Sequence, residues 1–182
     1  MEESSFLDGL KARESCRDYA PLPLEKEKIE QLIELSCLAP SAGNGQPWRF
    51  VAVTQPDTRL ALAKMTHTRH INGWTEQAPC IIALIEKIDE RMIKRYGELY
   101  VEKQWTTIDI GLCAQQLSLA ATALGLGSCI IGYFPEDEAK ALLGIADSDR
   151  LRLLITLGYP KEKTAPRPKK RLPTDEVLRF VE

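Results

Sequence analysis

The order of helical and strand patterns along the chain predicts, from the residues alone, an α/β protein with a parallel sheet. Apolar residues at helical spacing alternate with short β-branched runs along the sequence. One of these runs, residues 80–85, has no polar alternation, which predicts a strand with both faces covered. The 182 residues can bury a real core and contain no linker-like segment, so we expect a single domain over residues 1–182.

The composition is typical of a soluble globular protein, with 44% hydrophobic and 27% charged residues. The formal net charge of -2 gives no general attraction to nucleic acid or to an acidic membrane. The acidic residues 1–5 argue against a signal peptide, and no apolar run approaches the length of a membrane span. The five cysteines are scattered and include no CxxC pair, so we expect reduced thiols in a cytoplasmic protein.

The individual elements follow from periodicity, caps and breaks. Helical spacing predicts helices over residues 4–13, 24–38, 57–65, 89–103, 106–124 and 174–181, and a further short helix that starts at Pro135. Asp57 or Thr58 is the expected N-cap of the third of these helices, and Gly97 is a weak point in the fourth. Many small residues in 106–124 allow close helix packing, so this segment is the expected central helix. Strands are predicted over residues 48–54, 80–85, 128–134 and 151–159.

The segment 38–50 is a polar loop between a helix and a strand. Its two glycines, Gly43 and Gly45, allow positive φ angles and a close approach of backbone to a ligand. Its polar side chains can both donate and accept hydrogen bonds; they are Ser41, Asn44 and Gln46. A flat polar heterocycle needs such an edge. The alternative is an ordinary helix-to-strand turn, which uses the same residue types.

Two arginines four residues apart, with a serine between them, form a candidate anion site at Arg13, Ser15 and Arg17. The alternative is a solvated helix end, in which Glu14 and Asp18 pair with these arginines. Both interpretations fit the residues alone.

A second basic segment, residues 161–173, follows the last predicted strand. It is either a second set of phosphate ligands or a solvated loop. A third interpretation, a nucleic-acid-binding tail, rests on this segment alone and predicts salt-sensitive binding.

The remaining polar and aromatic clusters carry little specific chemistry. His67 and His70 are the only histidines, and no nearby carboxylate completes a ligand set, so we expect no metal site. Residues 67–77 are interpreted as a mobile rim over a pocket. Tyr96, Tyr100 and Trp105 belong either to helix packing or to a substrate wall.

Four segments, taken together, resemble the FMN-dependent nitroreductase family. Residues 13–19 are similar to the family pattern R-x-S-x-[RK]-x-[FY], and residues 40–48 to P-S-[AS]-x-N-x-Q-P-W. Residues 109–132 are similar to the long central helix and the strand after it. Residues 157–160 and 169–173 are similar to the C-terminal strand and a phosphate-binding basic pair. The order and spacing of these segments span nearly the whole chain.

The resemblance implies a homodimer with FMN at the subunit interface and no catalytic side chain in the strict sense. Arg13, Ser15 and Arg17 would hold the phosphate, the ribityl chain and the pyrimidine edge, and Lys169 and Arg171 would complete the phosphate site. The remaining positions would face the isoalloxazine ring: Pro40, Ser41, Ala42, Asn44 and Gln46 from the other subunit, and Ile130, Ile131 and Gly132 on a second side.

The resemblance also changes the expected fold to α+β, with a mixed, largely antiparallel sheet wrapped by helices. The implied activity is hydride transfer from NADH or NADPH through the flavin to a nitroaromatic, a quinone or a similar small acceptor. Alternatives are a specialised flavoprotein of the same fold, such as a dehydrogenase, a dehalogenase or a flavin-processing enzyme, and a non-catalytic flavin-binding or redox-sensing protein. We expect neither a nucleic acid nor a membrane as partner.

Overall fold

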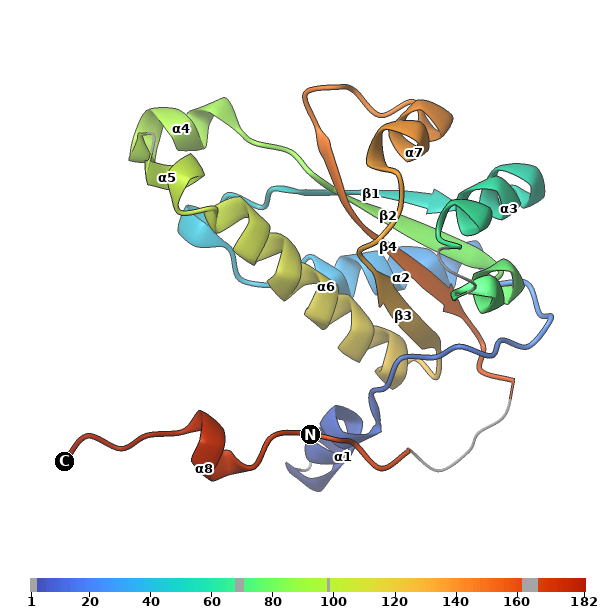
Figure 1. Ribbon diagram of the computed structural model, residues 1–182, viewed down its shortest axis with the longest axis horizontal. Coiled ribbons are helices and arrows are strands. Elements are labelled where there is room, and N and C mark those ends of the chain that lie inside the picture. Colours follow the sequence, from blue (N-terminus) through green and yellow to red (C-terminus); the bar gives the residue numbers. More distant parts are fainter. Residues whose placement is uncertain (1–2, 68–70, 98, 162–166) are drawn as a thin grey trace.

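A four-stranded sheet forms the centre of the molecule in a computed structural model that describes residues 3–67, 71–97, 99–161 and 167–182. The strands are β1 (Trp48–Val53), β2 (Cys80–Glu86), β3 (Gly127–Ile131) and β4 (Arg150–Gly158), and their order is β1-β2-β4-β3 (Figure 1). Each neighbouring pair runs antiparallel. The antiparallel sheet expected from the family resemblance is therefore confirmed.

Strand β2 is buried along its whole length, as its unbroken apolar run predicts. Alternate side chains enter two separate cores, because neighbouring residues of a strand point to opposite faces of the sheet. Ile82 and Leu84 pack into one core, and Ile81 and Ala83 pack into the other. Both faces of the sheet must therefore be covered by helices.

Helices cover both faces of the sheet (Figure 1). The first core joins the sheet to α2 (Lys26–Ser36) and to the longest helix, α6 (Trp105–Ala123). The second core joins it to α3 (Pro56–Met65) and α7 (Glu136–Leu143). Helix α6 is the central helix that its small residues predict, since it packs on α2 and on the sheet.

The parallel sheet suggested by helix–strand alternation is wrong. Val53, at the end of β1, pairs with Ile81 near the start of β2, so the connection through α3 returns to the end of the sheet that it left. The connection through α7 does the same, because Ile131 at the end of β3 pairs with Leu154 in β4. The alternation of helices and strands in the sequence does not show whether the next strand starts at the same end of the sheet or at the opposite end, so it does not set the strand direction.

Several predicted boundaries also need correction. The N-cap of α3 is Gln55, whose side-chain oxygen accepts from the Thr58 backbone N–H at 2.6 Å, and neither Asp57 nor Thr58 has this role. The helix predicted over 174–181 is only the single turn α8 (Thr174–Val177), and the strand predicted over 128–134 ends at Ile131. The chain breaks at Gly97, as expected, between α4 (Glu90–Tyr96) and α5 (Leu99–Glu102).

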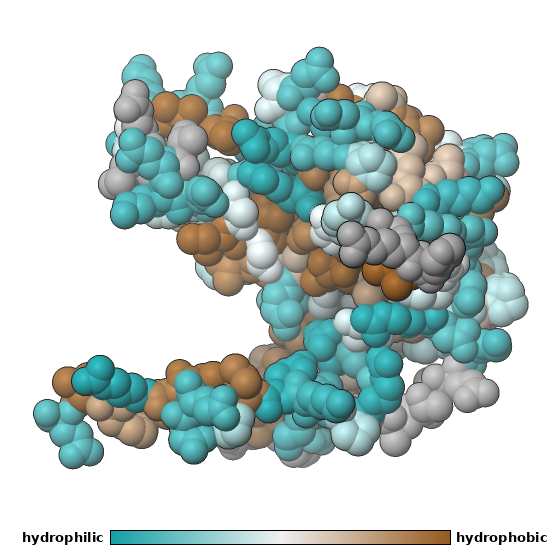
Figure 2. Space-filling model, viewed as in Figure 1, coloured by the Kyte–Doolittle hydropathy of each residue, from teal (hydrophilic) through white to brown (hydrophobic). Residues whose placement is uncertain are grey.

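The segments at the two ends of the described chain both lie outside the sheet layers, and the C-terminus projects away from the N-terminus (Figure 1). Helix α1 (Glu3–Ala12) packs against α6, and residues 167–182 extend past it away from the body. Figure 2 shows a hollow between this C-terminal tail and the body, with hydrophobic side chains along the tail and on the opposite wall. None of the described helices is long and apolar enough to span a bilayer.

Candidate functional site

The two basic segments of the sequence meet in one surface cavity. Its volume is about 270 Å³, and its lining contains six basic residues and one acidic residue, Glu14. The basic residues come from opposite ends of the chain: Arg13 and Arg17, and Arg167, Lys169, Lys170 and Arg171. Ser15 adds a hydroxyl to the same lining. Such a concentration of guanidinium and ammonium groups is complementary to a phosphate group. We call this cavity the basic cradle.

The alternative in which Glu14 and Asp18 neutralise the two arginines is wrong in the described chain. The Glu14 carboxylate instead accepts from the Arg167 guanidinium at 3.1 Å, and Asp18 lies 3.8 Å from the Lys161 ammonium. Within the described residues, no ion pair includes Arg13 or Arg17. The acidic neighbours therefore fix the rim of the basic cradle and leave these two cations to face an anion.

Arg167 and Lys169 tie the C-terminal tail to the N-terminal segment. The Arg167 guanidinium donates to the Ser15 carbonyl at 2.9 Å, and the Lys169 ammonium donates to the carbonyls of Lys11 and Arg13, the latter at 2.7 Å. Lys169 thus places its charge at the C-terminal end of α1, where the helix dipole favours a cation. An ammonium has three donors, so one remains for a ligand in the cavity.

The start of β3 lies next to the basic cradle. The Cys16 backbone N–H donates to the Ser128 carbonyl at 2.9 Å, and Ser15 forms a parallel bridge with Ser128. Of the predicted β3 positions, Ile130 exposes its side chain, whereas Ile131 is buried in the second core. Only the backbone of Ile131 is therefore available to a ligand, and Gly132 has no side chain to obstruct one.

The thiols beside the basic cradle are not activated nucleophiles. Burial raises the pKa of both Cys16 and Cys129 above the usual thiol value, although the nearby Arg17 opposes the shift at Cys129. A nucleophilic cysteine needs a lowered pKa, because the thiolate is the reactive form. Neither thiol is therefore a candidate nucleophile.

The polar loop 40–47 has a backbone that most residues avoid. Gly43, Asn44 and Gln46 all have positive φ angles, of 56°, 56° and 45°. For non-glycine residues this conformation costs free energy and needs support from the surroundings. The Gln46 backbone N–H donates to the Ser41 hydroxyl at 3.1 Å, and the Gln46 side-chain amide donates to the Asn44 side-chain oxygen at 3.1 Å. The predicted polar side chains are therefore held together as a group.

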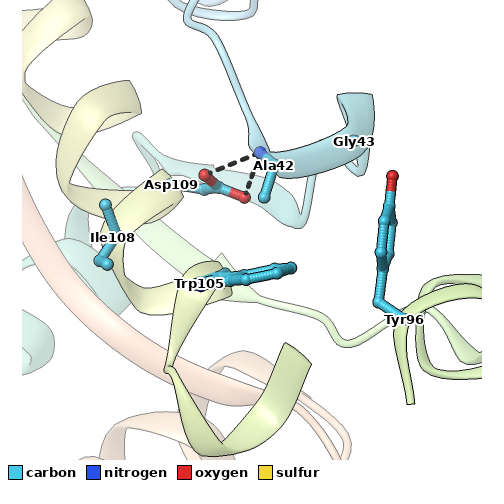
Figure 3. Close-up of a pocket in the computed structure, with 6 residues that line it drawn as sticks. All are labelled: Ala42, Gly43, Tyr96, Trp105, Ile108 and Asp109. Atoms are coloured by element: carbon cyan, nitrogen blue, oxygen red, sulfur yellow. Dashed lines mark hydrogen bonds between the residues drawn. The ribbon is translucent and has the colours of Figure 1, made fainter. Parts of the chain in front are cut away.

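Asp109, near the N-terminal end of α6, anchors this loop from behind. The Ala42 backbone N–H donates to both carboxylate oxygens, at 3.1 and 3.2 Å (Figure 3). Burial raises the pKa of the Asp109 carboxyl, and the hydrogen bond from Ala42 partly opposes this shift. The carboxyl also borders a cavity of about 330 Å³.

Aromatic side chains form the other wall of that cavity. Tyr96 and Trp105 stand across from Ala42 and Gly43 (Figure 3), and their rings meet edge to face at 5.9 Å between centroids. Tyr100 packs against both rings. The two interpretations of these aromatics therefore both apply: Tyr100 is fully buried packing, whereas Tyr96 and Trp105 line a cavity.

The structure does not bring all of the predicted site residues together within one chain. Arg13, Ser15, Arg17, Lys169 and Arg171 line the basic cradle beside the C-terminal end of α6, where Gly127 packs on Cys16. The polar loop instead meets Asp109 near the N-terminal end of the same helix. Ala123 lies fourteen positions after Asp109 in α6, which is about 20 Å at the α-helical rise.

Sequence reasoning did not identify two residues of this arrangement. Arg167 had a weak signal, since it stands between prolines in the basic segment. Asp109 had none, because an acidic residue near the start of a helix is common and favourable by itself. Only the fold shows that its carboxylate faces the loop.

The histidine-containing segment offers no metal site in the described residues. His67 lies 3.5 Å from the Glu76 carboxylate, and His70 lies outside the described residues. No group of three or more His, Cys, Asp or Glu side chains in the described part of the chain could hold a metal ion. The expectation of a mobile rim over 67–77 stays a prediction.

Comparison with known proteins identifies the family. The Nitroreductase family model matches residues 10–70 and 64–159. A Streptococcus pyogenes protein named "Putative NAD(P)H nitroreductase Spy0809" is 32% identical over 200 residues, which cover 95% of this chain and 98% of that protein. The chain therefore belongs to the nitroreductase family, and the resemblance read from the sequence is confirmed.

Solved structures agree with this assignment. A nitroreductase family protein from Streptococcus pneumoniae superimposes with a TM-score of 0.82 at 30% identity, over 97% of this chain and 100% of the other. A Clostridium difficile protein described as an FMN-dependent nitroreductase superimposes with a TM-score of 0.76 at 23% identity, over 97% and 99%. At 23% identity, the Clostridium difficile structure shows a shared fold and nothing more.

Proposed function

We propose that the protein is an FMN-dependent oxidoreductase that passes hydride from NADH or NADPH through the flavin to a nitroaromatic, a quinone or a similar small acceptor. The basic cradle is the observation that carries this proposal, because Arg13 and Arg17 face it while the neighbouring carboxylates are engaged elsewhere. The full-length similarity to a protein named as an NAD(P)H nitroreductase supports the same activity.

The residues of the basic cradle fit the phosphate of FMN. Arg13, Arg17, Lys169 and Arg171 supply its cationic partners, and the Ser15 hydroxyl adds a neutral contact. Arg17 is also our candidate for the fixed positive charge beside the pyrimidine edge, where it favours negative charge on the reduced ring. We place the backbone of residues 130–132 along the flavin ring, as the family resemblance implies.

A homodimer completes the site. The polar loop and the basic cradle lie at opposite ends of α6, so a second copy is needed to bring a loop to each basic cradle. Helix α6 offers a surface for this copy, because Ile108 and Leu112 are exposed along it beside Gly111. Exposed apolar side chains at this helical spacing are typical of a helix–helix interface.

The C-terminal tail supplies a second contact between the copies. Its apolar side chains have no cover in the single chain, and Phe180 is 76% exposed. Strand β1 is an edge of the sheet, and a groove of about 890 Å³, partly lined by Ile29, Ile33 and Phe50, runs between it and α2. We place the partner's tail in this groove, where it covers an otherwise open strand edge. Removing residues 173–182 is expected to convert the dimer to monomer in sedimentation velocity.

The protein's own chemical contribution is binding, orientation and exclusion of water. Bound FMN would supply the hydride transfer from the reduced nicotinamide to the acceptor. No side chain of the chain needs to act as acid or base, because water can provide the proton. The cavity beside Tyr96 and Trp105 gives a planar ligand an aromatic surface on which to stack. The five free cysteines fit the reducing cytoplasm, where we place the protein.

The test is an absorption spectrum of the purified protein, the mass of any small molecule released on denaturation, and the oxidation of NADH and NADPH with menadione or nitrofurazone as acceptor. We expect a yellow protein that releases FMN and turns over repeatedly. A colourless protein that does not take up added FMN contradicts the proposal. A protein that binds FMN without turnover is a flavin-binding or sensing protein instead.

A further inference from the structure

The loop that the proposed function places on the flavin is held by one buried carboxylate. Asp109 is only 3% exposed, and both of its oxygens accept from the Ala42 backbone N–H (Figure 3). No ion pair with Asp109 occurs in the part of the chain that the structure describes. A charge-assisted hydrogen bond to a backbone amide is stronger than a neutral one, and its direction fixes the peptide that donates it.

A carboxylate at this position costs stability. Burial of a charge without a cation disfavours the ionised form, which is why the pKa of Asp109 is raised. No cation in the described part of the chain compensates for its charge, because the hydrogen bond from the Ala42 backbone N–H is the one contact that opposes the effect of burial. An uncharged side chain would fill this position at lower cost.

The opposite side of the loop is packed against the aromatic side chains of α4 and α5. A Cβ atom added at Gly43 would lie 2.4 Å from the Tyr96 hydroxyl oxygen, and one added at Gly45 would lie 2.9 Å from that of Tyr100. The Tyr100 hydroxyl is fully buried and has no hydrogen-bond partner among the described residues. The tyrosines therefore restrict the loop by shape, and Asp109 provides the directional polar contact to its backbone.

We propose that Asp109 is a positioning residue for flavin binding. Its carboxylate fixes the Ala42 peptide and thereby presents the side chains of Ser41, Asn44 and Gln46 to the flavin edge as a preformed set. Preformed donors and acceptors bind a rigid ring more tightly than a mobile loop does, because less conformational entropy is lost on binding. This inference rests on the proposed function, which places the loop against the flavin of the other subunit.

Three single variants of the full chain separate this role from a general structural one. Asp109→Leu removes the acceptor for the Ala42 N–H, and Asp109→Asn keeps one acceptor oxygen without the charge. Thr107→Val is the matched control, since Thr107 lies in the same turn of α6 but contacts Glu86 and Arg152, not the loop. FMN affinity is measured on dimer fractions by quenching of flavin fluorescence. Amide hydrogen exchange over residues 40–46 is measured on the FMN-free protein by mass spectrometry.

We expect Asp109→Leu to weaken FMN binding about tenfold or more and to speed exchange in the loop, because the acceptor for the partly buried Ala42 N–H is lost. Asp109→Asn is expected to stay within about threefold of the unchanged protein, and Thr107→Val to leave both readouts unchanged. The inference is overturned if Asp109→Leu binds FMN normally, or if Thr107→Val weakens it equally. Failure of the unchanged protein to bind FMN would contradict the proposed function instead, and loop exchange would still test the Asp109 contact.

Discussion

The two halves of the proposed site are built in opposite ways. The basic cradle is assembled at the surface from segments near the two ends of the chain, where Arg167 pairs with Glu14 and both Arg167 and Lys169 donate to backbone carbonyls. The polar loop is fixed from inside, by a carboxylate that is almost fully buried and by aromatic rings packed on its glycines. The basic cradle attracts its ligand by charge, and the loop depends on a fixed shape. Substitutions should therefore affect the two halves through different measurable quantities.

The largest expected effect belongs to the basic cradle. Replacement of both Arg13 and Arg17 by alanine removes two charge-assisted contacts, which together are worth roughly 3 kcal/mol or more, a loss of FMN affinity of about a hundredfold or more. The remaining affinity should depend less on salt, because screening acts on exposed charges. Isothermal titration with FMN at two ionic strengths measures both effects. Arg91→Ala is the control, since that exposed guanidinium pairs with Asp89; an equal loss there would show that the basic cradle is not specific.

The next effect concerns the buried ion pair below α6, where a substitution should lower the stability of the protein without changing its affinity for FMN. Glu86 is 2% exposed and pairs with Arg152, which is 30% exposed. Arg152→Met leaves a buried carboxylate unpaired and should lower the free energy of unfolding by about 2 kcal/mol, less than for a fully buried pair. Urea denaturation measures this loss, and the FMN affinity of the folded protein should not change. If Arg152→Met lowered the FMN affinity and left the free energy of unfolding unchanged, the Glu86–Arg152 pair would have a role in binding and not in stability.

A smaller effect is expected within the loop. Gly43→Ala puts a side chain at a φ of 56° and against the Tyr96 hydroxyl, so it should cost about 1 kcal/mol of stability and weaken FMN binding severalfold. Gly144→Ala is the matched control, because Gly144 has a φ of 65° and open space around its Cα. Both variants should lose stability, but only the first should lose affinity. Equal affinities would show that the shape of the loop does not matter for binding.

The smallest expected effect is the pH dependence that Asp109 contributes. Because the pKa of this carboxyl is raised, the folded protein binds the proton more tightly than the unfolded chain does, and the cost of burying the charge is relieved as pH falls through the raised pKa. Asp109→Asn should therefore be more stable than the unchanged protein at pH 7, and the difference should shrink at acidic pH. Urea denaturation at pH 7 and pH 4.5 measures this difference, and an advantage that grows on acidification would contradict the sign.

The same contrast explains what could be predicted from the sequence. Part of the basic cradle could be predicted, because charge and spacing at Arg13 and Arg17 are visible in the residues themselves, but Arg167 was missed and the phosphate role came from the family resemblance. Strand β2 could also be predicted, because a short unbroken apolar run is typical of a strand that is buried on both faces. The antiparallel direction of the strands followed from the family resemblance and not from the pattern, since pairings such as Val53 with Ile81 depend on how a connection returns.

Contacts between distant segments could not be predicted. The role of Asp109 depends on the fold that places α6 behind the loop, and the sequence near it looks like any helix start. The sequence predicts a short helix over residues 174–181, which include Val177 and Val181. In the structure only one turn forms, and both side chains are exposed. The sequence pattern alone does not show whether such apolar residues pack as a helix within the chain or contact a partner subunit.

The most direct test of the two-subunit site is a heterodimer with one defect on each side. One chain carries Arg13→Ala and Arg17→Ala, the other carries Ser41→Ala, Asn44→Ala and Gln46→Ala, and different affinity tags isolate the mixed dimer. If each site takes its basic cradle from one subunit and its loop from the other, the mixed dimer contains one site with both defects and one intact site. We predict about one tightly bound FMN per heterodimer, although neither homodimer binds it well. A heterodimer with no tight FMN site would contradict the shared site.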